Sequence, residues 1–95
     1  MVVSSGKQGA TATIYSGSAK IHWVIFTGDT GQEPTLTIYD NTEASGTAVF
    51  FGMVSDENHT LPVVFPKGKE PICHTGIHAV LSAATGDYII GYEPR

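Results

Sequence analysis

The β-branched residues of this chain limit its fold more than any other feature. Valine and isoleucine each occur eight times and threonine eleven times, whereas 95 residues include only three leucines. β-Branched side chains lose rotamer freedom in a helix and pack well on a pleated sheet. The composition therefore favours strands, and no segment combines a helical repeat with capping residues.

Apolar runs recur about every ten residues and are separated by Gly, Pro, Asp, Asn and Ser, which is typical of an all-β sandwich or barrel. A chain of 95 residues makes one domain with a thin core. We therefore predict a small antiparallel β-sandwich, jelly-roll or immunoglobulin-like, over residues 10–95. About eight short strands are expected, at 10–15, 20–27, 34–40, 46–54, 59–65, 70–74, 76–83 and 87–93.

Three of the predicted strands are apolar at both odd and even positions. The segment "TLTIY" alternates cleanly, but "IHWVIF", "TAVFFGMV" and "LPVVF" do not. Because each sheet of a two-layer sandwich has one outer face, such strands predict burial against another subunit. The alternative is that these residues lie singly on the surface or twist inward at strand ends. The expected oligomer contacts are Trp23, Ile25, Phe50, Phe51, Met53, Val63 and Phe65.

The first nine residues, "MVVSSGKQG", are rich in Gly and Ser and have few apolar anchors apart from Val2 and Val3. This composition predicts a flexible N-terminal arm over residues 1–9 that orders on a partner. A disordered terminus without a role is the alternative.

Charge and hydropathy narrow the classes of partner. The net charge is −4 and the five basic residues form no stripe, which argues against nucleic-acid binding. No window approaches the ~20 apolar residues of a membrane span, and no signal peptide is visible, so we expect a soluble, unprocessed protein without a membrane partner. Only 15% of the residues are charged, against about 25% in an ordinary soluble domain, so neighbours are expected to cover part of the surface.

The stretch "YDNTEASGT" could be a ligand loop or the turn between two strands. Asp40, Asn41, Ser45 and Gly46 are residue types that satisfy their own backbone in turns or tolerate positive φ. The alternating oxygen ligands of a calcium loop are missing. We predict a hairpin connection.

The residues Cys73, His74 and His78 come nearest to a metal-binding pattern. Adjacent residues of a strand point to opposite faces, so these three converge only if the chain kinks there. The chain has no GxSxG elbow and no second cysteine. We expect no metal site, no cofactor and no enzymatic activity.

Exposed aromatic side chains on a sheet face could stack on sugar rings, as in a carbohydrate-binding module. The candidates are Trp23, Tyr15, Tyr39, Tyr88 and Tyr92. The competing expectation places Trp23 and Phe26 in the core and keeps the tyrosine hydroxyls in water at strand ends.

The segments "IHWVIFTGD", "PTLTIYDNTEASGTAVFF", "LPVVFP" and "GIHAVLSAATGDYIIGYEP" follow one another in a characteristic order. Together they resemble the small β-sandwich virion proteins of tailed bacteriophages, which include capsid cement or decoration proteins and short fibre components. The resemblance covers roughly residues 9–93 and lies in the order of strands and turns.

The resemblance implies a non-enzymatic protein that assembles as a homo-oligomer, often a trimer, on the outer surface of the capsid. It would clamp neighbouring subunits of the major capsid protein, in virions that assemble in the cytoplasm of a bacterial host. We expect the arm residues Val2, Val3 and Lys7 to contact the capsid protein. A tail or fibre adaptor is the second structural possibility.

Overall fold

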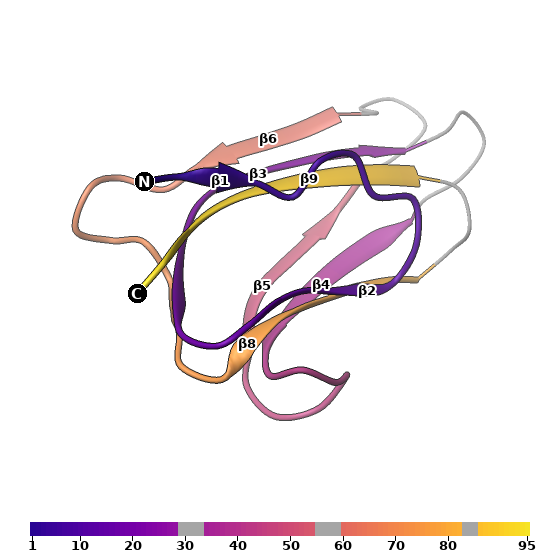
Figure 1. The fold of residues 1–95 in the computed structure, drawn as a ribbon. Helices are drawn as coiled ribbons and strands as arrows, with labels where there is room; N and C mark the ends of the chain where they lie inside the picture. Colours follow the sequence, from indigo (N-terminus) through magenta and orange to yellow (C-terminus); the bar gives the residue numbers. More distant parts are fainter. Residues whose placement is uncertain (29–33, 55–59, 83–85) are drawn as a thin grey trace.

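The computed structural model describes residues 1–28, 34–54, 60–82 and 86–95, and within these ranges the chain forms strands and turns but no helix. Two antiparallel sheets lie face to face (Figure 1). The predicted all-β sandwich is therefore confirmed.

Sheet A has the spatial order β1 (Val3–Ser4), β9 (Gly86–Pro94), β3 (Ala19–Gly28) and β6 (Thr60–Val64), and the short β7 (Ile72–Cys73) pairs with the first residues of β3. Sheet B has the order β2 (Ala12–Ser16), β8 (Gly76–Leu81), β4 (Thr35–Asp40) and β5 (Ala48–Met53). Of the nine strands in the described ranges, eight overlap the predicted segments, and β1 falls in the predicted arm.

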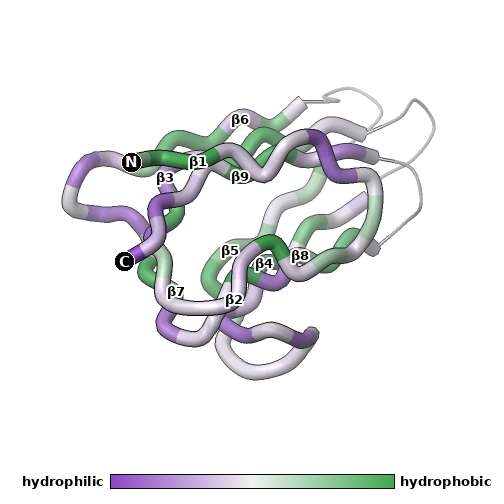
Figure 2. Tube along the Cα trace, viewed as in Figure 1, coloured by the Kyte–Doolittle hydropathy of each residue, from purple (hydrophilic) through white to green (hydrophobic). Residues whose placement is uncertain are grey.

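The core lies between the sheets and is built from alternate residues of the central strands β3, β9, β4 and β8. Figure 2 shows apolar residues along the strands of both layers, while hydrophilic residues gather in loop 66–70 and at the C-terminus. The largest buried side chains on these strands are Ile21, Val24, Phe26, Leu36, Ile38, Ile77, Tyr88 and Ile90. Alternation of this kind is what packs one face of each strand inward.

The N-terminal segment lies along β9 rather than apart from the domain. Val3 pairs with Tyr92, the Ser5 N–H donates to the Ile90 carbonyl at 2.8 Å, and Gln8 exchanges two backbone hydrogen bonds of 2.9 Å with Tyr88. These bonds satisfy backbone groups of β9 that would otherwise form an open sheet edge. The same region also buries the Tyr88 hydroxyl, which donates to the Ala10 carbonyl at 2.7 Å, and burial raises the pKa of Tyr88 to about 12.

The connection between β4 and β5 is a hairpin loop, as predicted. The Asn41 side-chain amide donates to the Ser45 carbonyl at 3.1 Å, the Thr42 N–H donates back to Asn41 Oδ1 at 2.7 Å, and Gly46 has a φ of 89°. Asp40 Oδ1 accepts hydrogen bonds from the backbone of the β7–β8 turn, at Thr75 and Gly76. Burial pushes the pKa of Asp40 up, but these backbone donors outweigh it and the pKa is lowered overall.

Trp23 lies on the outer face of sheet A, so the expectation that it is a core residue is wrong, whereas Phe26 is fully buried as expected. The cause is a register shift between Ile21 and Trp23 in the pairing of β3 with β9. This bulge keeps Ile21 and Val24 inward and turns Trp23 outward. The indole lies across β9 at Gly91, where a Cβ atom would overlap the ring.

We expect Gly91→Ala to lower the free energy of unfolding by about 1–3 kcal/mol, because overpacking in a tight site forces side chains and backbone to shift. This cost exceeds the gain of about 0.5–1 kcal/mol that Ala offers over Gly in a strand. Urea denaturation of both proteins gives the difference. In the Trp23→Ala background the same substitution should be close to neutral, and an equal cost in both backgrounds would contradict the role assigned to the indole.

Candidate interaction surface

Five apolar side chains lie together on the outer face of sheet A, and we call them the outer patch: Trp23 and Ile25 on β3, Pro62 and Val64 on β6, and Ile89 on β9. The register places Trp23 directly opposite Val64, and Ile25 directly between Pro62 and Ile89. Directly paired residues of antiparallel strands share one face of the sheet. The five side chains therefore form one continuous surface.

The outer patch is accessible and is not needed to complete the core. Val64 is 77% exposed and Ile25 38% exposed, Pro62 is exposed, and Trp23 and Ile89 are half-buried. The buried cluster between the sheets includes none of these five residues. A contiguous exposed apolar patch is a candidate interaction site, whereas apolar residues that are exposed singly need no explanation.

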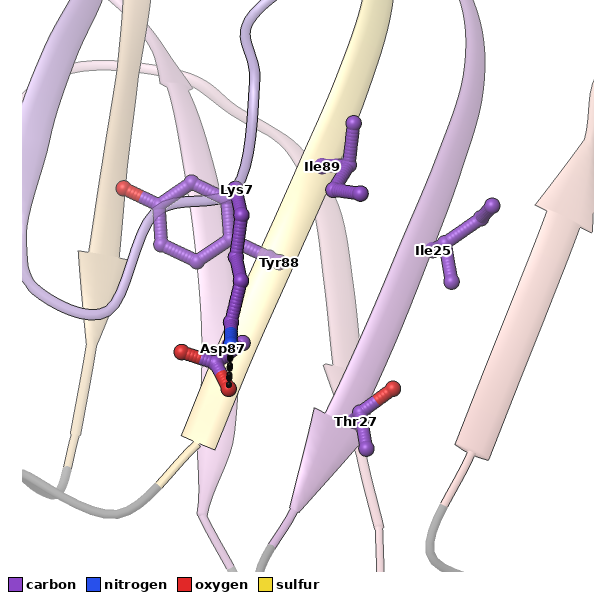
Figure 3. Close-up of a pocket in the computed structure, with 6 residues that line it drawn as sticks. All are labelled: Lys7, Ile25, Thr27, Asp87, Tyr88 and Ile89. Carbon is purple, nitrogen blue, oxygen red and sulfur yellow. Dashed lines mark ion pairs between the residues drawn. The ribbon is translucent and has the colours of Figure 1, made fainter.

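One end of the outer patch opens into a shallow cavity of about 270 Å³, shown in Figure 3. Ile25 and Ile89 project from neighbouring strands, and Thr27 lies beyond Ile25 on β3. Lys7 Nζ lies 3.6 Å from Asp87 Oδ2 at the rim. The cavity thus combines an apolar floor with an exposed ion pair, of a kind that contributes little to stability.

The opposite end of β3 carries a cluster of charged groups. His22 Nε2 lies 2.9 Å from Glu93 Oε1, and His22 Nδ1 lies 3.9 Å from Glu70 Oε2. The Met1 ammonium lies 3.0 Å from Glu93 Oε2. The hydrogen bond from His22, followed by the bond and the charge of the Met1 ammonium, lowers the pKa of Glu93 to about 2.

A second hollow of about 520 Å³ lies beside this cluster, between β3 and loop 66–70. The loop is held by a turn in which the Lys69 N–H donates to the Pro66 carbonyl at 2.9 Å and Gly68 has a φ of 88°. Positive φ at the third position of such a turn is the reason for glycine there. Lys20 and Lys67 line the hollow together with the two carboxylates, so it is mixed in charge.

The seven predicted oligomer contacts fall into three separate groups. Trp23 and Ile25 belong to the outer patch of sheet A. Phe51 and Met53 lie on the outer face of sheet B, 61% and 60% exposed, beside Thr37 and Thr35 of β4. The remaining three are at the margin between the sheets: Phe50 and Phe65 meet edge to face with ring centroids 6.3 Å apart, and Val63 pairs with the inward Val24.

Three residues of the outer patch are absent from the sequence-based prediction, namely Pro62, Val64 and Ile89. Val64 lies in a segment that is apolar at both odd and even positions, but selecting Val64 rather than Val63 as the outward residue requires the strand register. Pairing with Trp23 is the signal that identifies Val64. The expected capsid contacts Val2 and Val3 are 44% and 39% exposed on the N-terminal segment, at the edge of sheet A.

The structure does not bring Cys73, His74 and His78 together. Cys73 is buried, and burial, followed by the nearby Asp40 charge, raises the pKa of its thiol to about 11. His74 is exposed in the turn, while His78 Nδ1 lies 2.9 Å from Thr13 Oγ1 on the outer face of sheet B. Within the described ranges, no three His, Cys, Asp or Glu side chains are grouped so that they could hold a metal ion.

The aromatic candidates for sugar stacking are also dispersed. Tyr88 and Tyr92 point into the core, and Tyr15 packs against Tyr92 with ring centroids 5.4 Å apart. Tyr39 lies opposite His78 on sheet B. Trp23 is thus the one candidate that the structure places on the outer face of sheet A.

Comparison with known proteins yields no family model, curated protein or solved structure that matches this chain. Among the described residues there is also no helix long and apolar enough to cross a membrane.

The low pKa of Glu93 predicts an acid-sensitive contribution to stability. Its folded pKa of about 2 lies below the ordinary value of 4.5, so the contribution is complete above pH 4.5 and is lost as the pH falls towards 2. We expect Glu93→Gln to lower the melting temperature at pH 5.5 and to have a much smaller effect at pH 2. Glu43→Gln, in the β4–β5 loop, is the control that should show no such change, and a Glu93→Gln effect that is independent of pH would contradict the assignment.

Proposed function

We propose that this chain is a non-enzymatic structural protein of a phage virion, a capsid cement or decoration protein that binds the major capsid protein as a homo-oligomer. The observation that carries the proposal is the outer patch, an exposed apolar face on a domain whose core is complete without it. The resemblance of the strand and turn order to small virion proteins is the reason for proposing a phage capsid as the assembly. It favours a trimer and a place on the outer surface of the capsid.

Contact energies of modest size suffice for such a role. Full burial of Val64, which is 77% exposed, is worth roughly 1–2 kcal/mol, and burial of the remaining exposed part of Ile25 is worth less. A protein that binds a repeating shell makes the same contact many times. In an oligomer, binding of one subunit raises the effective concentration of the others at neighbouring sites, and this raises the overall affinity. The outer patch can therefore stabilise a shell without a deep pocket.

The N-terminal segment gives the proposal a second contact. Val2 is exposed, and Lys7 is held by a surface ion pair that can be exchanged for a carboxylate of the partner at little cost. We propose that Val2, Val3 and Lys7 contact the major capsid protein beside the outer patch. Point substitutions such as Val2→Asp test this better than deletion of residues 1–9, because that deletion also removes the backbone bonds to Tyr88 and Ile90.

A carbohydrate-binding role is the second candidate, because Trp23 is accessible and lies across Gly91 as an aromatic surface. Titration with cell-wall oligosaccharides, followed by Trp23 fluorescence, distinguishes it. A saturable change that disappears in Trp23→Ala would favour this candidate over the shell contact.

We expect the protein to sediment with heads when heads and tails from native source cells are separated on a density gradient. Val64→Asp should reduce its recovery on heads at least tenfold, because it places a charge in an apolar contact. Ser16→Asp, at the exposed end of β2 and on the opposite edge of sheet B from β5, is the matched control and should retain binding. Recovery with tails would favour the adaptor, and recovery with neither particle would contradict a virion role.

A further inference from the structure

The outer edge of β5 presents backbone groups for pairing. The Val54 N–H donates to the Pro34 carbonyl next to β4, at 3.4 Å. Because N–H directions alternate along a strand, Gly52 also faces β4, and the N–H and C=O groups of Phe51 and Met53 point away from it. Among the strands that the structure describes, none pairs with this side of β5.

Each of the other three sheet edges carries a feature that opposes pairing. β1 is only two residues long, and the pairing of β2 is interrupted between Thr13 and Tyr15. The Phe65 N–H donates to the His22 carbonyl at 3.0 Å, so alternation places the nitrogen of Pro62 on the free side of β6, where it has no hydrogen to donate. Short, bulged and proline-bearing edges are the usual protections against association.

The β5 edge lacks these protections along most of its length. Its one irregularity lies at the start, opposite Ile38 and Tyr39, and Phe50 to Met53 follow in regular register. The strand "AVFFGM" contains neither proline nor charge. On a chain of net charge −4, two copies can approach here without bringing carboxylates of the strand together.

We infer that β5 pairs antiparallel with β5 of a second copy about a two-fold axis. The two sheets B then form one continuous sheet, and Phe51 and Met53 of each copy pack against those of the other on its outer face. This pairing rests on the self-association in the proposed function, assigns it to a strand edge, and makes it a dimer in place of the trimer that the resemblance favours. Because a two-fold contact closes at two copies, the outer patch stays available for a different partner.

The size of the contact predicts a weak dimer. Side chains that are 61% and 60% exposed each offer on the order of 100 Å², so four of them fall well short of the roughly 1,200 Å² of a stable interface, even with paired backbone added. We expect a dissociation constant between about 1 μM and 1 mM. A shell that holds copies side by side raises their local concentration into this range.

Amide hydrogen exchange of the intact protein, measured by NMR at about 10 μM and about 1 mM, tests the backbone pairing directly. We expect the Phe51 and Met53 amides to be protected about two- to tenfold more at the higher concentration, the factor depending on the dissociation constant. The Val64 amide, on the free edge of β6, is the internal control and should not change. Protection that is independent of concentration at Phe51 and Met53 would overturn the inference.

Sedimentation equilibrium of matched variants separates the edge from the outer patch. Phe51→Lys should weaken the dimer at least about tenfold, because it sets like charges side by side across the pair. Phe51→Pro should do the same by removing the edge donor while the bonds to β4 remain. Val64→Lys introduces the same charge on the other sheet and should leave the dimer intact, and melting curves confirm that each variant is folded.

The two proposals fail in different ways. If Val64→Lys abolishes self-association and Phe51→Lys does not, or if a trimer persists in both Phe51 variants, the β5 pairing is overturned and the homo-oligomer of the proposed function stands. A wild-type protein that is monomeric at about 1 mM overturns both the pairing and the self-association.

Discussion

The antiparallel pairing of β3 with β9 is the constraint on which both faces of sheet A depend. β3 is apolar on both sides, so polarity alone does not select which of its side chains point inward, and a slip of one residue would exchange the faces. The contact of Trp23 with Gly91 removes this ambiguity. Asp87, Ile89 and Glu93, the other outward positions of β9, carry side chains, and only Gly91 leaves room for the indole.

This register has opposite consequences for the two layers of side chains. Inward, it aligns Val24 and Phe26 with Ile90 and Tyr88 at the centre of the core. Outward, it aligns Ile25 with Ile89 and leaves both partly exposed. A second exposed group, Phe51 and Met53, lies on the other sheet, so the domain offers two unlike apolar surfaces on opposite sides. Such an arrangement suits a molecule that contacts its own copies and a different partner at the same time.

The sequence predicted well what local residue types determine. β-Branched runs located the strands, Asn41 and Gly46 identified the hairpin loop, and the absence of alternation identified the strands that expose Trp23, Ile25, Phe51 and Met53. Two bulges, near Trp23 and at the start of β5, limited the prediction of which side chains face outward, because each bulge changes the alternation along its strand. Three of the expected oligomer contacts, Val63, Phe50 and Phe65, face or border the interior, and for Val63 the pairing with Val24 on β3 decides this.

Other features of the structure are determined by contacts between distant segments. The N-terminal segment pairs with β9 through its backbone, and backbone pairing leaves no pattern of side chains in "SSGKQG" that could have indicated it. The protection of β6 by Pro62 depends on which way one nitrogen points, and this requires the hydrogen bond from Phe65 to His22. Contacts between distant segments also decide the fate of the metal-binding pattern at Cys73 and His78. The β7–β8 turn and the pairing of each strand keep these side chains apart.

The burial of Cys73 has a consequence for any dense assembly of this protein. It is the only cysteine of the chain, and with a pKa of about 11 its thiol stays protonated at neutral pH, where thiol exchange requires the thiolate. Copies packed side by side in an oxidising medium therefore acquire no covalent cross-links through this residue. In an assembly of the proposed kind, subunits would then be held by non-covalent contacts alone, which would allow a misplaced subunit to dissociate and rebind.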